Sequence, residues 1–173
     1  MFLILPVCIL IVTLLLMEIT SWAMHKFLFH GPLWFIHKSH HKPHTHFFEW
    51  NDVFSILFGG ISVYMMWLGG ENFAWTFWVG LGISLYGLIY FIFHDWFIHN
   101  RLKSFKTNNW YLLGIRRAHK IHHKSLSKHG SEEFGLLTAS LKYFKDARKT
   151  NLESALKQNS DCTRKAVTLE NEI

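Results

Sequence analysis

Histidine stands out in this sequence, because thirteen of the 173 residues are His. Ten of them form two copies of one ordered pattern, in which HxxxxH is followed by HxxHH. The first copy reads HKFLFH and HKSHHK, and the second reads HDWFIH and HKIHHK. HKSHHK and HKIHHK differ only where Ser39 is replaced by Ile121. The candidate metal ligands are therefore His25, His30, His37, His40, His41, His94, His99, His119, His122 and His123.

The spacing of these histidines predicts on which side of a helix each ring lies. At about 100° per residue, positions i, i+3 and i+4 of a helix lie within an arc of roughly 100°, so each HxxHH is predicted to present three imidazoles from one helical face. Positions i and i+5 differ by about 140°, so HxxxxH fits a helix end whose last turn loosens. Ten imidazoles are too many for one metal ion and suit two ions, for which Fe, Zn, Cu and Ni are the candidates.

Two features separate this pattern from simpler metal-binding sequences. Cys8 and Cys162 lie far apart and form no CxxC, which excludes a thiolate zinc site and a disulfide framework. A passive metal buffer is typically a histidine-rich tract, whereas here two different spacings recur in the same order. The remaining histidines, His44, His46 and His129, lie outside the pattern and are predicted not to be ligands.

Three apolar runs must position the two copies. They cover residues 2–23, 53–68 and 73–93. A helix needs about 20 apolar residues, with a range of roughly 17 to 25, to cross a bilayer. The first and third runs meet this length, and the second is predicted to be a thin span. The first run has no charged start and exceeds the roughly 7 to 15 apolar residues of a signal peptide, so we expect a retained helix.

The distribution of charge gives the expected orientation. Half of the residues are hydrophobic, and 17% are charged, against about a quarter in soluble domains. The net charge is +6, but Lys and Arg lie only in 26–42 and after residue 100, which favours a membrane rather than nucleic acid as the partner. The positive-inside rule predicts that 25–52 and 94–173 are cytoplasmic and that the N-terminus and the GGEN turn lie outside. Every histidine then lies on one membrane face.

The predicted fold class is therefore an all-α integral membrane protein with three transmembrane helices and a cytoplasmic, histidine-rich cap for two metals. Residues 1–144 form the predicted membrane-embedded domain. Within it, 102–118 is too charged to span, and the short apolar segment 134–144 is expected on the membrane surface. Residues 145–173 are polar and have no aromatic residue, so we predict a flexible cytoplasmic tail.

Four further polar residues are candidates for supporting the ligands. Glu18 lies seven residues before His25 on the same helical face, and an acid within a span usually faces a partner, so it is predicted to accept from His25. The alternative is a carboxylate wetted at the interface. Asp95 is predicted either to accept a ring N–H of a ligand or to be a helix-end charge. Asn51 and Asp52 open the second span, where they are predicted to cap the helix.

The order of the clusters resembles the fatty acid hydroxylase superfamily of histidine-rich membrane di-iron proteins. The stretches MEITSWAMHKFLFHG, HKSHHKPHTHFFEWNDVF, YGLIYFIFHDWFIHNR and RRAHKIHHK with FGLL look more narrowly like bacterial β-carotene hydroxylases, over roughly residues 10 to 140. The resemblance implies an O₂-dependent monooxygenase of the bacterial inner membrane. It would 3-hydroxylate β-ionone rings, taking β-carotene through β-cryptoxanthin to zeaxanthin. It also implies two Fe ions, replaceable by Zn in recombinant protein, and a ferredoxin-type electron donor.

Other functions remain open on the sequence. The same metal site would serve a carotenoid ketolase, or a hydroxylase or desaturase of fatty acids or sterols. A membrane metal transporter or metal-binding protein is the alternative from another class, but transport predicts histidines within the spans, and the pattern places none at mid-span. Arg116 and Arg117 could steer an acidic ferredoxin, although solvated charge at the membrane surface is the simpler interpretation.

Overall fold

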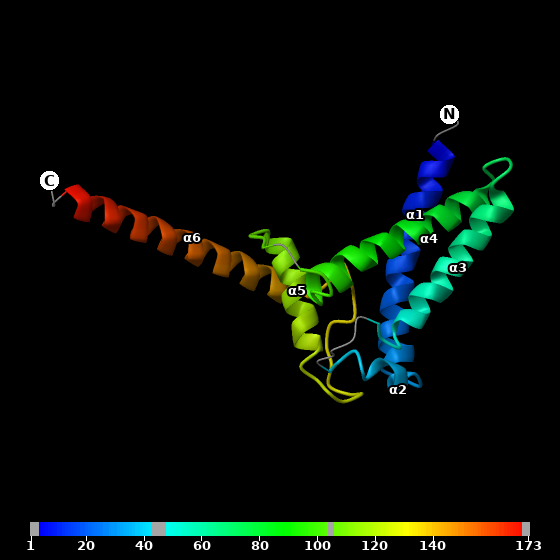
Figure 1. Cartoon of the computed structure of the whole chain (residues 1–173), viewed down its shortest axis with the longest axis horizontal. Helices are drawn as coiled ribbons and strands as arrows, with labels where there is room; N and C mark the ends of the chain where they lie inside the picture. Colours follow the sequence, from blue (N-terminus) through cyan, green and yellow to red (C-terminus); the bar gives the residue numbers. More distant parts are fainter. Residues whose placement is uncertain (1–3, 43–47, 104–105, 171–173) are drawn as a thin grey trace.

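The chain forms a helical structure in which one long polar helix projects away from a group of apolar helices (Figure 1). The computed structural model describes residues 4–42, 48–103 and 106–170, with side chains up to residue 157, and these residues contain no β-strand. The helices in chain order are α1 (Ile4–Ala23), η1 (Met24–Phe29), α2 (Trp34–His37), α3 (Asp52–Gly69), α4 (Trp75–Tyr90), η2 (Phe91–Ile98), α5 (Trp110–His122) and α6 (Leu141–Glu170).

Three of these helical stretches are long and apolar enough to cross a membrane, namely Ile4–Phe29, Asp52–Gly69 and Trp75–Ile98. The three predicted spans are thereby confirmed. The first and third run further than expected, because each continues into a π-helix, η1 or η2, without a break. Large apolar side chains such as Ile56 and Trp67 are more than two-thirds exposed, as lipid-facing residues would be.

Small residues set how closely the membrane helices pack. A Cβ atom added at Gly80 would lie 2.6 Å from the carbonyl oxygen of Ser62, where α3 meets α4. A Cβ atom at Gly82 would lie 2.7 Å from Cγ2 of Thr13, where α1 meets α4. Such close approach is how helices associate in a bilayer. Among the described residues no packing contact joins α1 to α3, and α3 and α4 diverge from their common hairpin turn (Figure 1).

The two HxxxxH pairs occupy the π-helices. The His30 N–H donates to the carbonyl oxygen of His25 at 3.1 Å, and the His99 N–H donates to that of His94 at 2.9 Å. These are i→i+5 bonds, which define a π-helix and bring residues five apart onto neighbouring turns. The ring centroids consequently lie 5.3 Å apart in the first pair and 4.5 Å apart in the second. The predicted loosening of the helix end is confirmed at both sites.

The two HxxHH clusters differ in backbone structure, which corrects the prediction that both lie on a helical face. The second cluster ends α5, with His123 as the residue after the helix. The first is split, because α2 ends at His37 and the next two histidines follow in turns. The Ser39 hydroxyl donates to the carbonyl oxygen of Ile36 at 2.9 Å, and such local bonds compete with helix formation.

The polar helix α6 packs on α5. The rings of Tyr111 and Phe144 stack at 5.5 Å between centroids, and Ala147 is buried. The predicted boundary between 144 and 145 therefore falls inside a helix that is anchored on both sides of it. Of the apolar segment 134–144, residues 134–140 form a loop and the last four residues begin α6. Flexibility of the remaining tail stays a prediction.

Candidate metal centre

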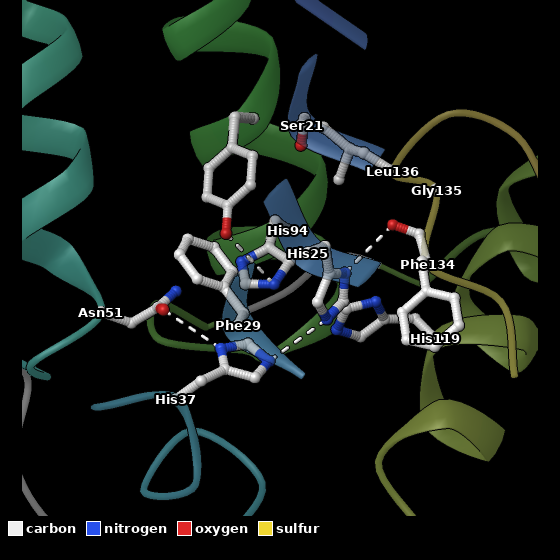
Figure 2. Close-up of a pocket in the computed structure, with 11 residues that line it drawn as sticks. Ser21, His25, Phe29, His37, Asn51, His94, His119, Phe134, Gly135 and Leu136 are labelled. Atoms are coloured by element: carbon white, nitrogen blue, oxygen red, sulfur yellow. Dashed lines mark hydrogen bonds between the residues drawn. The ribbon is translucent and has the colours of Figure 1, made fainter. Parts of the chain in front are cut away.

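All ten histidines of the repeated pattern converge at the end of the membrane helices where α1, α3 and η2 meet the loops and α5. Nine of them form two groups in which one ligand atom from each member lies within 4.8 Å of the others. The five-histidine group contains His25, His30, His37, His41 and His122. The four-histidine group contains His40, His94, His99 and His119. Figure 2 shows members of both groups around one small cavity.

The groups do not follow the two sequence copies, because the central histidine of each HxxHH crosses over. His122, from the second copy, has its Nε2 atom 3.1 Å from that of His30 in the first. His40, from the first copy, has its Nε2 atom 3.2 Å from that of His94 in the second. Each group therefore combines one HxxxxH pair with histidines from both HxxHH clusters. The two copies are interlocked rather than side by side.

His123 is the histidine that joins neither group by distance, yet it lies between them. Its ring centroid is 4.5 Å from that of His119, 4.7 Å from that of His99 and 4.4 Å from that of His41. Its Nε2 atom is buried and has no hydrogen-bond partner among the described residues. A buried polar atom without a partner is costly, so this nitrogen is available as a ligand. It corresponds to His41 in the repeat and would complete the four-histidine group.

Each member of the five-histidine group has its Nδ1 atom held by a neutral oxygen. His37 Nδ1 donates to the amide oxygen of Asn51 at 3.1 Å. The other four donate to main-chain carbonyl oxygens, at distances of 2.7 to 3.1 Å. These carbonyls belong to Phe134 (for His25), Lys128 (for His30), Ser125 (for His41) and Glu132 (for His122).

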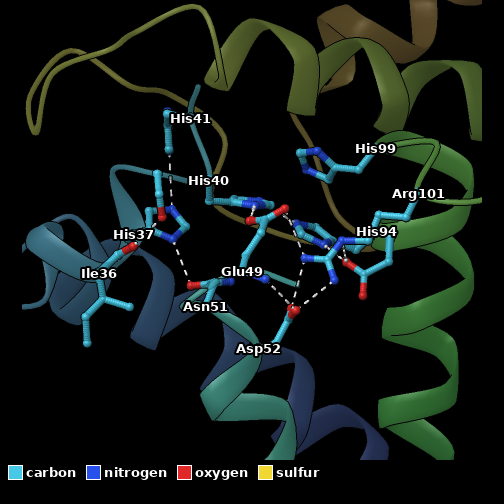
Figure 3. Close-up of polar contacts among 12 residues, drawn as sticks. Ile36, His37, His40, His41, Glu49, Asn51, Asp52, His94, His99 and Arg101 are labelled. Atoms are coloured by element: carbon cyan, nitrogen blue, oxygen red, sulfur yellow. Dashed lines mark hydrogen bonds and ion pairs between the residues drawn. The ribbon is translucent and has the colours of Figure 1, made fainter. Parts of the chain in front are cut away.

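In the four-histidine group, two Nδ1 atoms are held by carboxylates instead. His40 Nδ1 lies 2.7 Å from Oε2 of Glu49 (Figure 3), and His94 Nδ1 lies 2.7 Å from Oδ1 of Asp95. Arg101 connects these acids, because its guanidinium lies 3.1 Å from Oε1 of Glu49 and 3.8 Å from Oδ1 of Asp95. It also donates to both carboxylate oxygens of Asp52, at 3.0 and 2.9 Å.

These contacts decide the protonation of the rings. Because an oxygen accepts from Nδ1, that nitrogen carries the hydrogen and Nε2 presents its lone pair to the centre. Burial lowers the pKa of His37 to about 3, that of His122 to about 3 and that of His41 to about 4, so these rings are neutral at pH 7. In the four pairs whose Nδ1 atoms are both held in this way, neutral Nε2 atoms then face one another at 3.1 to 3.3 Å, as lone pair against lone pair.

Facing lone pairs in a buried site are unfavourable unless a cation lies between them. Neutral imidazoles whose other ring nitrogen donates to an oxygen are the usual form of metal-bound histidine. The residues present therefore fit metal ions at both groups, and imidazole ligands suit Fe, Zn, Cu or Ni.

Comparison with known proteins agrees with this geometry. Residues 10–144 match the model of the fatty acid hydroxylase family. The chain belongs to this family. The β-carotene hydroxylase of Paracoccus sp. (strain PC1) is 35% identical over 133 residues, which cover 76% of this chain and 82% of that protein. The β-carotene hydroxylase of Pantoea ananas is 36% identical over 129 residues, or 74% of each chain.

A plant relative matches a shorter region. The chloroplastic β-carotene 3-hydroxylase 2 of Arabidopsis thaliana is 37% identical over 107 residues, which cover 59% of this chain and 35% of that protein. No solved structure matches the chain.

Among the supporting residues of this hydroxylase, Asp95 forms the contact predicted for it, with His94. The prediction for Glu18 is wrong, because the Phe134 carbonyl holds His25 instead. The Glu18 carboxylate accepts from the Tyr86 hydroxyl at 2.8 Å and from the N–H groups of Leu136 and Leu137. Glu18 thus holds the loop that carries the Phe134 carbonyl, and this carbonyl in turn accepts from His25.

The predicted helix caps at the start of α3 are also not formed. Asn51 makes no side-chain cap bond, because its amide oxygen is used by the buried ring of His37. Leaving that ring N–H unsatisfied would cost more than leaving a cap unmade at a helix end near solvent. The Asp52 carboxylate accepts from the Glu49 N–H at 2.9 Å and from Arg101.

Sequence reasoning missed Glu49 and Arg101, which are the least exposed members of the acidic network. The sequence does contain a signal for Arg101, namely its position directly after the second HxxxxH pair and Asn100. Asn100 takes a positive φ of 55°, which Asn tolerates, and the chain turns back so that the Arg101 N–H donates to the Asp95 carbonyl. His129 is exposed and belongs to neither group. His44 and His46 lie outside the described residues.

A larger cavity opens from the membrane helices onto this centre. Its volume is about 500 Å³, and α1, α3, α4 and η2 supply most of its walls. Phe29, Asn51, Tyr90 and Ser21 line both this cavity and a smaller one of about 30 Å³, which reaches His25, His37, His94 and His119. The two spaces therefore adjoin at these four residues, and Tyr90 places its hydroxyl 3.4 Å from Nε2 of His94.

Proposed function

We propose that the protein is a carotenoid β-ring 3-hydroxylase, an O₂-dependent di-iron monooxygenase that takes β-carotene through β-cryptoxanthin to zeaxanthin. The observation that carries the proposal is the apolar cavity that ends at the ten-histidine centre. The names of the bacterial and plant relatives support the same substrate. A hydroxylase for a lipid-soluble ring needs both features together, namely access from the bilayer and a metal site at the inner end.

The cavity suits one end of a long apolar molecule. Its volume is within the roughly 300 to 1,000 Å³ of small-molecule sites. Most of its lining is apolar, with Phe54, Phe58 and Ile83 among the residues. Because α1 and α3 do not pack on each other among the described residues, the rest of a polyene can extend between them into lipid. We therefore infer that the β-ring enters the cavity and that the polyene of the substrate extends from it into the lipid.

The protein's own side chains have distinct tasks in this proposal. The ten histidines would hold two iron ions, which when bound supply the O₂-dependent redox chemistry that an unactivated ring C–H bond requires. Zn could occupy the same ligands in recombinant protein. Tyr90 and Phe29 line both the cavity and the small space at the histidines, and so would position the ring edge next to the centre. The apolar walls keep water away from the reacting carbon.

We further propose that the centre faces the cytoplasm and receives electrons from a ferredoxin-type donor. The positive residues near the spans lie on the histidine side, and the turn at the other end carries Glu71 and no base. The basic helix α5 would meet an acidic donor there. Arg117 donates to the Thr150 hydroxyl at 3.4 Å and Arg116 donates to the Asn100 amide oxygen at 3.0 Å, and both hydrogen bonds are exposed at the surface.

The test is expression in a host that accumulates β-carotene, followed by pigment analysis and metal analysis of the purified protein. We expect β-cryptoxanthin and zeaxanthin, with bound iron. A ketolase would give keto-carotenoids instead, and a fatty acid or sterol enzyme would leave β-carotene unchanged while altering host lipids. Either result from a well-expressed protein would overturn the proposed substrate. A His40→Ala variant at equal protein level provides the inactive reference.

A further inference from the structure

We infer that the two metal positions are electrostatically unequal, and that the four-histidine position holds its divalent ion more tightly than the five-histidine position does. The inference concerns a positioning role of Glu49 and Asp95, and it rests on the proposed function only in assuming that two ions bind. It follows from which oxygen accepts from each Nδ1 atom.

The contrast between the two positions covers every member of the five-histidine group. All five of its Nδ1 atoms donate to neutral oxygens, four from the main chain and one from Asn51. In the other group, His40 donates to Glu49 and His94 donates to Asp95, both at 2.7 Å. These two bonds have the short length of charge-assisted hydrogen bonds.

A carboxylate acceptor changes what the ring offers to a metal. It draws the Nδ1 hydrogen toward itself, which makes Nε2 a stronger donor and adds negative charge beside the ion. Replacing such an outer partner typically lowers metal affinity by about 10- to 100-fold. A main-chain carbonyl orients the ring equally well but carries no net charge. Orientation is therefore similar at both positions, and charge distinguishes them.

The acidic network itself indicates a cation on this side. The single guanidinium of Arg101 lies within 3.8 Å of three carboxylates, those of Glu49 and Asp52 (Figure 3) and that of Asp95. The Glu49 and Arg101 side chains are 4% and 7% exposed. An excess of buried negative charge is strongly unfavourable without a compensating cation. A divalent ion bound by His40 and His94 would lie directly beyond the two rings that these acids hold.

The number of ligands does not reverse this order. The five-histidine group has one more ligand by distance, but His123 has a buried Nε2 atom without a partner among the described residues and faces His99 and His119. With His123 bound, each position has five imidazoles. The two metal positions then differ only in the charge of the oxygens that hold their rings.

The experiment is a titration of the metal-free full-length protein in detergent with Co²⁺ under anaerobic conditions, in competition with a chelator. We expect two affinities that differ by about 10-fold or more. Glu49→Gln keeps an oxygen that can accept from His40 but removes the charge. It should weaken the tighter affinity by about 10- to 100-fold and leave the weaker one unchanged.

Asn51→Asp provides the reciprocal variant. It has nearly the same shape and places a carboxylate on His37, in the other group, so it should strengthen the weaker affinity and leave the tighter one unchanged. His99→Ala and His30→Ala, each removing a ligand from one group, assign the two affinities. Wild-type affinities that are equal would overturn the inference, as would a Glu49→Gln effect on the weaker ion alone or on both alike.

These outcomes are separate from those of the pigment assay. A protein that binds two unequal ions but makes no hydroxylated carotenoid would keep this inference and lose the proposed substrate. A protein that makes zeaxanthin but binds two equal ions would do the reverse. A Glu49→Gln variant that does not fold is replaced by Asp95→Asn, which removes the charge on His94 and should have the same effect on the same ion.

Discussion

The Nε2 atom of His30 lies 3.1 Å from the Nε2 atom of His122, although 92 positions separate them in the chain. His30 ends a π-helix of the first copy of the pattern, and His122 ends α5 in the second. The contact therefore links the two copies across the base of the membrane helices. With the matching contact between His40 and His94, it makes each metal position depend on both halves of the chain.

Substitution of His40 or His122, which each join the group of the other copy, should remove one metal ion and abolish the activity that needs both ions. We expect His122→Ala to lose one of its two bound ions and to lower hydroxylated pigment by at least about 100-fold, because the remaining rings cannot complete the site. Metal content and pigments are measured on the same preparation. His129→Ala is the matched control, since that exposed ring belongs to neither group. Full metal content in His122→Ala would contradict the ligand assignment.

Filling the large cavity should slow the reaction without unfolding the protein. A Cβ atom at Gly59 meets no atom within 4 Å, and Gly59 lines the cavity. We expect Gly59→Leu to reduce conversion of β-carotene by about 10-fold, because the added side chain takes up space needed by the ring. Gly60→Leu is the control, since Gly60 has the same open surroundings and does not line the cavity. Equal conversion by both variants would place the substrate elsewhere.

Glu18 should control the order of the loop that holds His25. Its carboxylate accepts from the N–H groups of Leu136 and Leu137, at 3.2 and 2.9 Å. Bonds to a charged acceptor contribute about 1.5 to 3 kcal/mol each, so Glu18→Gln should speed amide hydrogen exchange at these two residues by about 10-fold or more. Exchange is measured by mass spectrometry. Glu71→Gln makes the same chemical change at an exposed acid and should leave the loop unchanged.

Acid should destabilise the metal-free protein within a defined window. Burial lowers the pKa of His37 and His122 to about 3 and that of His41 to about 4, whereas histidine in an unfolded chain titrates near 6.5. Between these limits the unfolded state binds more protons than the folded state. The free energy of unfolding should therefore fall as the pH drops from about 6.5 to about 4. Above about pH 6.5 the full stabilisation by the neutral rings should be present.

The measurement is the melting temperature in detergent with a chelator, recorded as a function of pH. His41→Gln should flatten the dependence, because it removes one of the groups that must stay neutral. His129→Ala should keep the slope of the unaltered protein. A melting temperature that is constant between pH 6.5 and 4 would show that the buried rings do not resist protonation.

The sequence alone predicted the three membrane helices, the ten candidate ligands and the loosened helix ends at both HxxxxH pairs. These features depend on apolar length and on residue spacing, which are local properties of the chain. The π-helical bonds from His30 to His25 and from His99 to His94 lie where the five-residue spacing predicted a loosened helix end.

Only the tertiary structure decided how the histidines are divided and what supports them. The crossover of His40 and His122 depends on how α5 meets the membrane helices, and spacing within a motif carries no information about that. Four of the supporting oxygens belong to main-chain carbonyls, which every residue type has, so no side chain marks them. Glu49 became recognisable as the partner of His40 when the fold buried that ring N–H group, which then required an acceptor. Asn51 was a candidate from the sequence, but only the fold showed that it accepts from His37.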